Sequence, residues 1–89
     1  MNMKTLLTEK DSEAVYAILT EALGVDRAQL TPEAQIMDFS PDSLTLIEIS
    51  MALEDRFNLS IADESWERIK TVGDLFELVA ELMESSNRG

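Results

Sequence analysis

A stretch of helix-compatible sequence from about Asp42 to Phe57 constrains the fold of this chain most strongly. It contains no Gly or Pro after Asp42, and Asn58, a residue that tolerates the left-handed conformation in which helices end, follows it. At about 100° per residue, its apolar side chains divide between two faces of the helix. One face carries Leu46, Ile49, Leu53 and Phe57, and the nearly opposite face carries Leu44, Ile47 and Met51. A surface helix of a small domain needs only one apolar face to reach its core, so the second face is predicted to contact a partner.

The remaining sequence predicts three more helices. The first runs roughly from Glu9 to Leu23, has an apolar face that includes Val15 and Leu19, and ends at Gly24. Asp63 is expected to cap a brief third helix that reaches about Arg68. Thr71 is expected to cap a last helix to about Glu84, with Asp74 completing a weaker form of the capping box. The predicted fold is therefore all-α: a small four-helix bundle with a short third helix.

Between the first two helices, residues 25–41 are predicted to form a long ordered loop. Pro32 interrupts helix propagation, and several turn-forming residues follow it. The apolar residues of this stretch are spaced too irregularly for a helix and are expected to pin the loop to the bundle: Val25, Leu30, Ile36 and Phe39. We expect residues 1–89 to form one domain, with a flexible lead-in at 1–8 and a flexible tail at 85–89.

Ser43 lies at the beginning of the predicted second helix, and two positions relative to the helix start are open. Ser40 is a favoured N-cap and Pro41 a favoured first helical residue, which would place Ser43 inside the first turn. Ser43 could instead be the cap itself, with a purely structural role. In both arrangements Ser43 lies near the positive end of the helix dipole, where an attached phosphate is electrostatically tolerated.

The chain is strongly acidic, with 18 Asp and Glu against 7 Lys and Arg, for a formal net charge of −11. Such a surface repels nucleic acids and anionic membranes and attracts basic protein patches and divalent cations. The acids gather around Ser43 and the second apolar face: Asp38, Asp42, Glu48, Glu54 and Asp55. This distribution favours a docking surface for a basic partner, although an acidic surface also serves solubility alone.

Several function classes are excluded by residues that the chain lacks. It contains no Cys and no His, so thiolate metal sites and the commonest general base are absent. An EF-hand loop starting at Asp38 fails, because its sixth position is Ser43 instead of Gly and its twelfth is Ile49 instead of Glu. The sequence has no signal-peptide pattern and no candidate membrane span, so the expected location is the cytoplasm. We therefore expect a protein that is not an enzyme.

The triplet Asp42-Ser43-Leu44, the acidic helix after it and the later Thr71-Val72-Gly73 resemble the acyl carrier protein family. The resemblance covers roughly residues 24–82. It implies that Ser43 carries 4'-phosphopantetheine, attached by a phosphopantetheinyl transferase, whose thiol holds an acyl chain as a thioester. It also implies docking to acyl-transferring, condensing or acyl-activating enzymes with basic patches. The residues expected to dock are Asp42, Leu44, Ile47, Glu48, Met51, Glu54 and Asp55.

The sequence departs from the family pattern at a few positions. Ser40 stands where Gly is usual, Thr45 and Arg56 stand where fatty-acid carriers often have acids, and Trp66 is unusual in the third helix. These departures leave the serine in place and the pathway open. We expect a monomeric carrier for fatty-acid or polyketide-type biosynthesis. The alternatives are a peptidyl or aminoacyl carrier, and an acidic interaction module in which Ser43 is unmodified.

Overall fold

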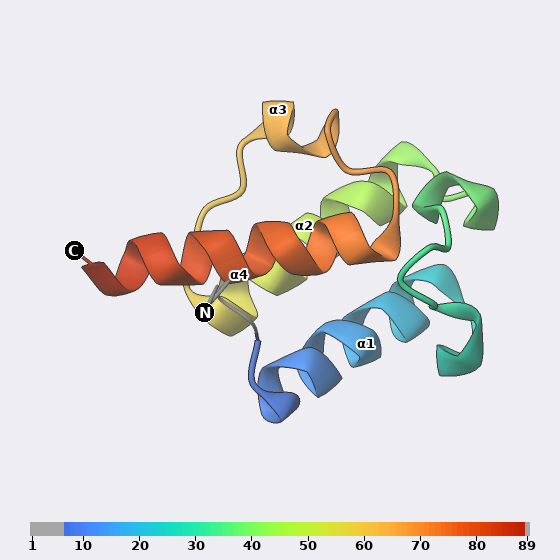
Figure 1. Cartoon of the computed structure of the whole chain (residues 1–89). Helices are drawn as coiled ribbons and strands as arrows, with labels where there is room; N and C mark the ends of the chain where they lie inside the picture. Colours follow the sequence, from blue (N-terminus) through green and yellow to red (C-terminus); the bar gives the residue numbers. More distant parts are fainter. Residues whose placement is uncertain (1–6, 89) are drawn as a thin grey trace.

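The computed structural model describes residues 7–88 and confirms the predicted all-α architecture (Figure 1). Its elements are α1 (Glu9–Leu23), η1 (Arg27–Gln29), η2 (Ile36–Phe39), α2 (Ser43–Phe57), α3 (Asp63–Trp66) and α4 (Val72–Arg88), where η denotes a 3-10 helix. The long loop between α1 and α2 and the short third helix are both present. The predicted lead-in falls largely outside the described residues. Among residues 7–88, no helix combines the length and apolar character that a bilayer crossing requires.

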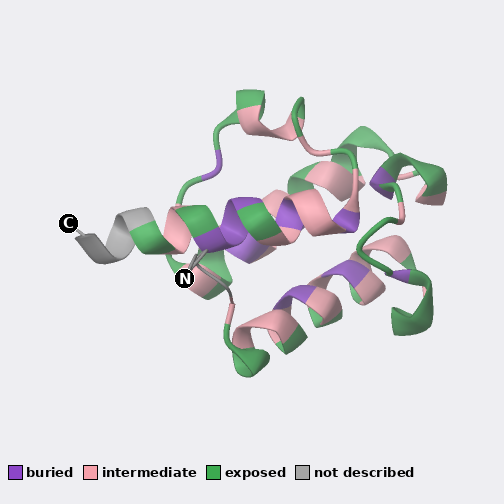
Figure 2. Ribbon diagram, in the orientation of Figure 1, coloured by how far each residue is buried: buried purple, intermediate pink, exposed green. Residues whose placement is uncertain are grey.

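The hydrophobic core lies between α1, α2 and α4. Each of these helices contributes fully buried aliphatic side chains: Val15, Leu19, Ile49, Leu53, Leu75 and Val79. Figure 2 shows the buried positions on the inner sides of these helices and exposed positions on their outer sides. Leu46 and Phe57, which were assigned to the same face of α2 as Ile49 and Leu53, are half-buried and pack against this core. The predicted inner face of α2 is confirmed.

The apolar residues of the long loop pin it to the bundle as predicted. Leu30 and Ile36 are buried, and Val25 and Phe39 are half-buried against the core. Burying these side chains removes apolar surface from water and offsets the entropy lost in ordering a loop of this length. The loop is therefore part of the packed structure, with the two 3-10 turns as its local order.

Backbone hydrogen bonds join the loop to the segment that leads into α4. They run from the N–H of Ile36 to the oxygen of Lys70 (2.9 Å), from Val72 to Ala34 (2.9 Å) and from Gly73 to Pro32 (3.0 Å). A Cβ on Gly73 would lie 3.1 Å from the Pro32 oxygen, so glycine permits this close approach. Two segments that are distant in sequence are thereby held together.

A second attachment fixes the start of the loop to α1. The Arg27 guanidinium pairs with Glu13 at 2.7 Å and lies over the Tyr16 ring, 4.1 Å from its centroid. The Tyr16 ring in turn packs against Phe76 of α4, with 4.9 Å between centroids. The ion pair is exposed and adds little stability by itself, but the tilted pair of Tyr16 and Phe76 rings adds apolar contact.

Several predicted helix ends are confirmed. Gly24 and Asn58 have positive φ angles of 68° and 56° and end α1 and α2 in the left-handed conformation. At the start of α4, the N–H of Asp74 donates to Thr71 Oγ1 (3.0 Å), and the N–H of Thr71 donates to Asp74 Oδ2 (3.1 Å). This reciprocal pair is the capping box expected from the sequence.

Three other predicted boundaries are wrong. Ala62, not Asp63, is the N-cap of α3: its backbone is extended, and its oxygen accepts the N–H of Ser65 at 2.9 Å. Asp63 therefore lies in the first turn, and α3 ends at Trp66 rather than near Arg68. At the other end of the chain, α4 continues to Arg88, beyond the expected end near Glu84.

Candidate functional site

Ser43 is the first residue of α2, and Asp42 is its N-cap. The Asp42 carboxylate accepts the N–H of Thr45 at 2.8 Å, so the cap is made without the Ser43 hydroxyl. Ser40 has a left-handed backbone (φ 55°) at the end of η2, which excludes it as the cap. Pro41 therefore does not begin the helix and Ser43 does not cap it. Ser43 does lie inside the first turn, as one of the two arrangements predicted, and the helix begins close to the expected start at about Asp42.

The Ser43 side chain is free for chemistry. The residue is exposed, and within residues 7–88 its hydroxyl has no hydrogen-bond partner. The N-terminal end of a helix carries a partial positive charge, which is favourable for an anion attached there. An exposed hydroxyl in this position can accept a phosphate-linked group without breaking any bond of the fold.

The Asp42 carboxyl next to Ser43 remains charged to low pH. The hydrogen bond from the backbone N–H of Thr45, followed by one from the Thr45 side chain, lowers the pKa of Asp42. Both bonds favour the ionised form, and because the group is exposed, desolvation opposes them only weakly. Asp42 is thus an anionic group at the site as well as the helix cap.

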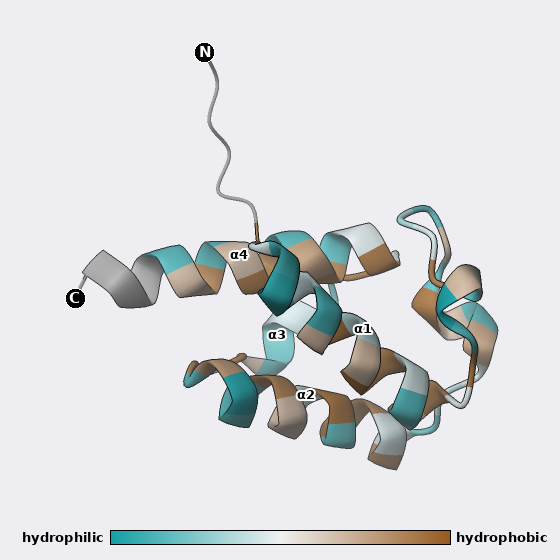
Figure 3. Ribbon diagram, turned by 90° about the horizontal axis from the view of Figure 1, so that it is seen from below, coloured by the Kyte–Doolittle hydropathy of each residue, from teal (hydrophilic) through white to brown (hydrophobic). Residues whose placement is uncertain are grey.

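The second apolar face of α2 is exposed as the sequence predicted. Leu44, Ile47 and Met51 keep 62%, 53% and 61% of their surface accessible. Figure 3 shows apolar segments recurring along the length of α2. Met37 in η2, at 60%, is a comparably exposed apolar side chain. An exposed helical row of large apolar side chains beside a free hydroxyl is the kind of surface that binds a partner protein.

The acidic residues assigned to docking are not equivalent. Glu48 and Asp55 are exposed, in keeping with the prediction. Glu54 is half-buried, and its Oε2 accepts the N–H of Ile61 at 2.7 Å, which ties α2 to the segment before α3. The sequence did not predict this internal role, because Ile61 is seven positions away and reaches Glu54 only through the fold.

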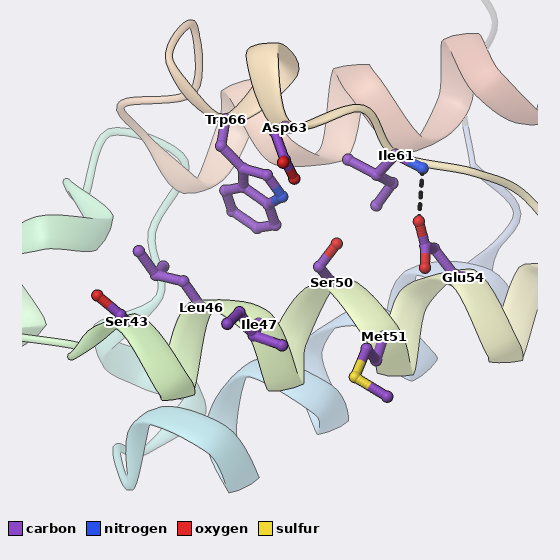
Figure 4. Close-up of a pocket in the computed structure, with 9 residues that line it drawn as sticks. All are labelled: Ser43, Leu46, Ile47, Ser50, Met51, Glu54, Ile61, Asp63 and Trp66. Carbon is purple, nitrogen blue, oxygen red and sulfur yellow. Dashed lines mark hydrogen bonds between the residues drawn. The ribbon is translucent and has the colours of Figure 1, made fainter.

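A groove of about 430 Å³ lies between α2 and the α3 segment, and Ser43 stands at its edge (Figure 4). It is lined by Ser43, Leu46, Ile47, Ser50, Met51, Glu54, Ile61, Asp63 and Trp66. Sequence analysis did not bring Ser50, Ile61, Asp63 and Trp66 together with Ser43. The one hint of this groove in the sequence was Trp66, a residue unusual in the third helix of the family. The volume falls within the range of small-molecule sites.

The described residues offer no cluster of three or more acidic, histidine or cysteine side chains that could hold a metal ion. The chemistry of this surface therefore rests on the serine hydroxyl, the acidic groups and the apolar groove.

Comparison with known proteins identifies the family of this chain. Residues 13–79 match the family model described as "Phosphopantetheine attachment site". The chain is 46% identical over 68 residues to an acyl carrier protein of Helicobacter pylori strain J99, a match covering 75% of this chain and 87% of the relative. A second H. pylori acyl carrier protein, from strain G27, is 44% identical over the same length and with the same coverage.

Two solved structures share the fold. The acetyl form of the actinorhodin acyl carrier protein from Streptomyces coelicolor superimposes with a TM-score of 0.70 and 30% identity, covering 94% of this chain and 99% of that one. The hexanoyl form of the carrier from the actinorhodin polyketide synthase of that organism also gives 0.70 and 30%, covering 93% and 98%.

The chain therefore belongs to the acyl carrier protein family, whose members bear phosphopantetheine and are carriers without catalytic activity. Its role is that of a fatty acid or polyketide carrier. Family membership implies that it meets a phosphopantetheinyl transferase and biosynthetic enzymes. The exposed, unpartnered hydroxyl of Ser43 fits such a group.

Proposed function

We propose that Ser43 is the attachment point of 4'-phosphopantetheine and that acyl intermediates are carried on it and presented to partner enzymes through the exposed face of α2. The observation that carries this proposal is the exposed Ser43 hydroxyl, without a hydrogen-bond partner in residues 7–88, at the first position of α2. It lies inside the matched segment 13–79. When attached, the group supplies a thiol that forms thioesters.

In the attachment step, Ser43 Oγ forms a bond to phosphorus as the bond between that phosphorus and the ADP part of coenzyme A breaks. The serine proton is lost, and 3',5'-ADP leaves. The transferase supplies the base and Mg²⁺, because the described residues contain neither a histidine nor a metal cluster. The chain itself supplies an accessible nucleophile and the positive end of α2, which stabilises the phosphodiester.

Docking is divided between charged and apolar groups. Glu48, Asp55 and Asp42 offer exposed carboxylates to Arg and Lys of a partner, and such rim charges mainly accelerate encounter. Leu44, Ile47 and Met51 form the central apolar contact, which decides how long the complex lasts. Glu54 contributes less than predicted, since one of its oxygens already accepts the Ile61 N–H. A small patch of this kind suits brief visits to several enzymes.

The partners proposed here are the transferase and the acyl-transferring, condensing or acyl-activating enzymes of fatty-acid or polyketide-type synthesis. The H. pylori relatives are named acyl carrier proteins, and one similar structure is named as the carrier of the actinorhodin polyketide synthase of S. coelicolor. We propose that residues 1–89 act as one monomeric carrier domain in the cytoplasm. No observation favours aminoacyl loading.

Intact mass measurement tests the attachment. The chain is co-expressed with a broad-specificity phosphopantetheinyl transferase, and the expected result is a gain of one phosphopantetheine. Ser43→Ala should abolish the gain. Ser50→Ala is the matched control, because Ser50 lines the same groove and should leave the gain unchanged. An unchanged wild-type mass with several transferases would favour the unmodified interaction module instead.

A further inference from the structure

Two hydrogen-bonding groups face the groove from its opposite walls. The Ser50 hydroxyl points into it from α2, and the Trp66 indole projects from α3 toward α2, with its nitrogen at the ring edge drawn nearest Asp63, another lining residue (Figure 4). Both residues are half-buried. Within the described part of the chain, neither the Ser50 hydroxyl nor the indole N–H has a hydrogen-bond partner. While the groove is open, both groups can hydrogen-bond to water.

A guest that fills the groove displaces that water. Beyond its thioester carbonyl, a saturated chain offers no polar atom in return, and leaving polar groups without partners opposes its entry. The indole N–H can only donate, and the Ser50 hydroxyl can donate or accept. Oxygen atoms on the guest would restore both bonds, while Leu46 and Ile61 contact its carbon atoms.

The charges of the groove restrict the kind of oxygen. Asp63 and Glu54 both line it, and Glu54 is held in place by the Ile61 N–H at 2.7 Å. Two carboxylates disfavour a guest that is itself an anion. The described lining contains no Lys or Arg that would compensate. Neutral carbonyl and hydroxyl oxygens satisfy the donors without this repulsion.

We infer that Trp66 and Ser50 are specificity-determining residues that favour acyl chains bearing a neutral carbonyl or hydroxyl group over saturated chains of equal length. The inference rests on the proposed attachment at Ser43, which lines the same groove and from which a tethered chain can fold back along α2. The preferred class is oxoacyl or hydroxyacyl thioesters, of which the 3-oxohexanoyl group is the representative tested. Trp66 provides a direct reporter, because it is the single tryptophan of the chain.

The test compares two chains of the same length on the ¹⁵N-labelled protein. A transferase loads hydrolysis-resistant amide analogues of the hexanoyl and 3-oxohexanoyl forms, and intact mass confirms loading. The readout is the indole N–H cross-peak in a proton–nitrogen correlation spectrum. The 3-oxohexanoyl form should move this peak from its position in the unloaded holo form, and the hexanoyl form should move it clearly less. Ser50→Ala should reduce the difference, whereas Ser12→Ala, a serine of α1, should not.

Trp66→Phe keeps an aromatic ring but removes the N–H, so a second readout is needed. For the true thioesters, the rate at which hydroxylamine releases the acyl group is measured. This rate is normalised to the rate for the same acyl group on free pantetheine. Trp66→Phe should accelerate release of the 3-oxohexanoyl group about two- to tenfold and leave the hexanoyl rate unchanged, as expected for one lost hydrogen bond. Equal peak movements for both chains, or equal effects on both release rates, would overturn the inference. A missing mass gain would instead overturn the attachment at Ser43 on which it rests.

Discussion

At the scale of single residues, Asp42 combines two roles that can be separated. Its carboxylate caps α2 through the Thr45 N–H (2.8 Å), and it stands beside Ser43 as a docking charge. Thr45 lowers the pKa of Asp42 in the folded state. A carboxyl with a lowered pKa contributes stability above its ordinary pKa, and that contribution is lost as pH falls through the folded-state value.

Asp42→Asn should therefore make the stability of the fold fall less steeply as the pH is lowered. Asparagine is also a good N-cap, so the urea midpoint near neutral pH should change little. Between about pH 6 and about pH 3, the midpoint of Asp42→Asn should fall less than that of the wild type. Asp74→Asn provides a comparison, because the pKa of Asp74 is lowered by the backbone N–H groups of Lys70 and Thr71. Identical acid profiles for Asp42→Asn and wild type would show that the cap charge has no energetic role.

The sequence predicted residues whose roles depend on local geometry. Gly24 and Asn58 end helices through their own backbone conformation, and Thr71 caps through a residue three positions away. The predicted cap of α3 failed because the capping position is defined by the extended backbone of Ala62, and alanine carries no side-chain signal for it. Likewise, serine is a residue type that favours the N-cap position, but the backbone of Ser40 has the left-handed conformation of a turn.

At the scale of elements, α2 is a helix with a core face and a partner face. Leu53→Ala should lower the free energy of unfolding by roughly 2–5 kcal/mol, because the side chain is fully buried. Ile47→Ala and Met51→Ala should change it by about 0.5 kcal/mol or less, as for surface substitutions. Urea denaturation followed by circular dichroism measures all three, and equal losses would contradict the two-faced helix.

The same variants should rank differently in a docking assay. Ile47→Ala and Met51→Ala should lower the rate of phosphopantetheine transfer to Ser43, by about fivefold or more if either is a central anchor. Met37→Ala is the control, since Met37 is as exposed as Met51 but lies in η2. Transfer rates are measured by the time course of the mass gain. An equal reduction by Met37→Ala would mean that the effect does not depend on the α2 face.

The groove between α2 and α3 could not be predicted from the sequence. Helical periodicity places residues relative to their own axis, but it does not say where Trp66 lies relative to Ser50 or Ser43. That relation depends on the path of residues 58–62 from the end of α2 to α3, which the Glu54–Ile61 bond helps to fix. Periodicity therefore predicted the exposed face of α2 and not the cavity beside it.

At the scale of the whole molecule, charge is the dominant property. A net charge of −11 on 89 residues makes the folded state repel itself. Raising NaCl from about 10 mM to about 150 mM shortens the Debye length from about 30 Å to about 8 Å and should raise Tm. A rise of about 4–8 °C would correspond to roughly 1 kcal/mol for a domain of this size.

Screening can be distinguished from ion binding by repeating the melt in MgCl₂ at matched ionic strength. The described residues hold no metal-binding cluster, so the two salts should raise Tm to a similar degree. A much larger rise in MgCl₂ would indicate specific divalent sites. Indifference to both salts would show that the acids are too dispersed to affect folding.

The two walls of the groove differ in how they are supported, and this affects what partner enzymes can detect. α2 is anchored along its length by the fully buried Ile49 and Leu53. In contrast, α3 has no fully buried residue: Trp66 packs half-buried against the core, and the hydrogen bonds that hold this wall lie at its ends, between Glu54 and Ile61 and between Lys70 and both Ile36 and Asp74. A bulky guest would widen the groove by displacing the chain between those ends, while α2 keeps its shape. An enzyme that contacts α2 alone would therefore bind the carrier whichever acyl group it bears. An enzyme that distinguishes substrates before transfer would have to contact α3.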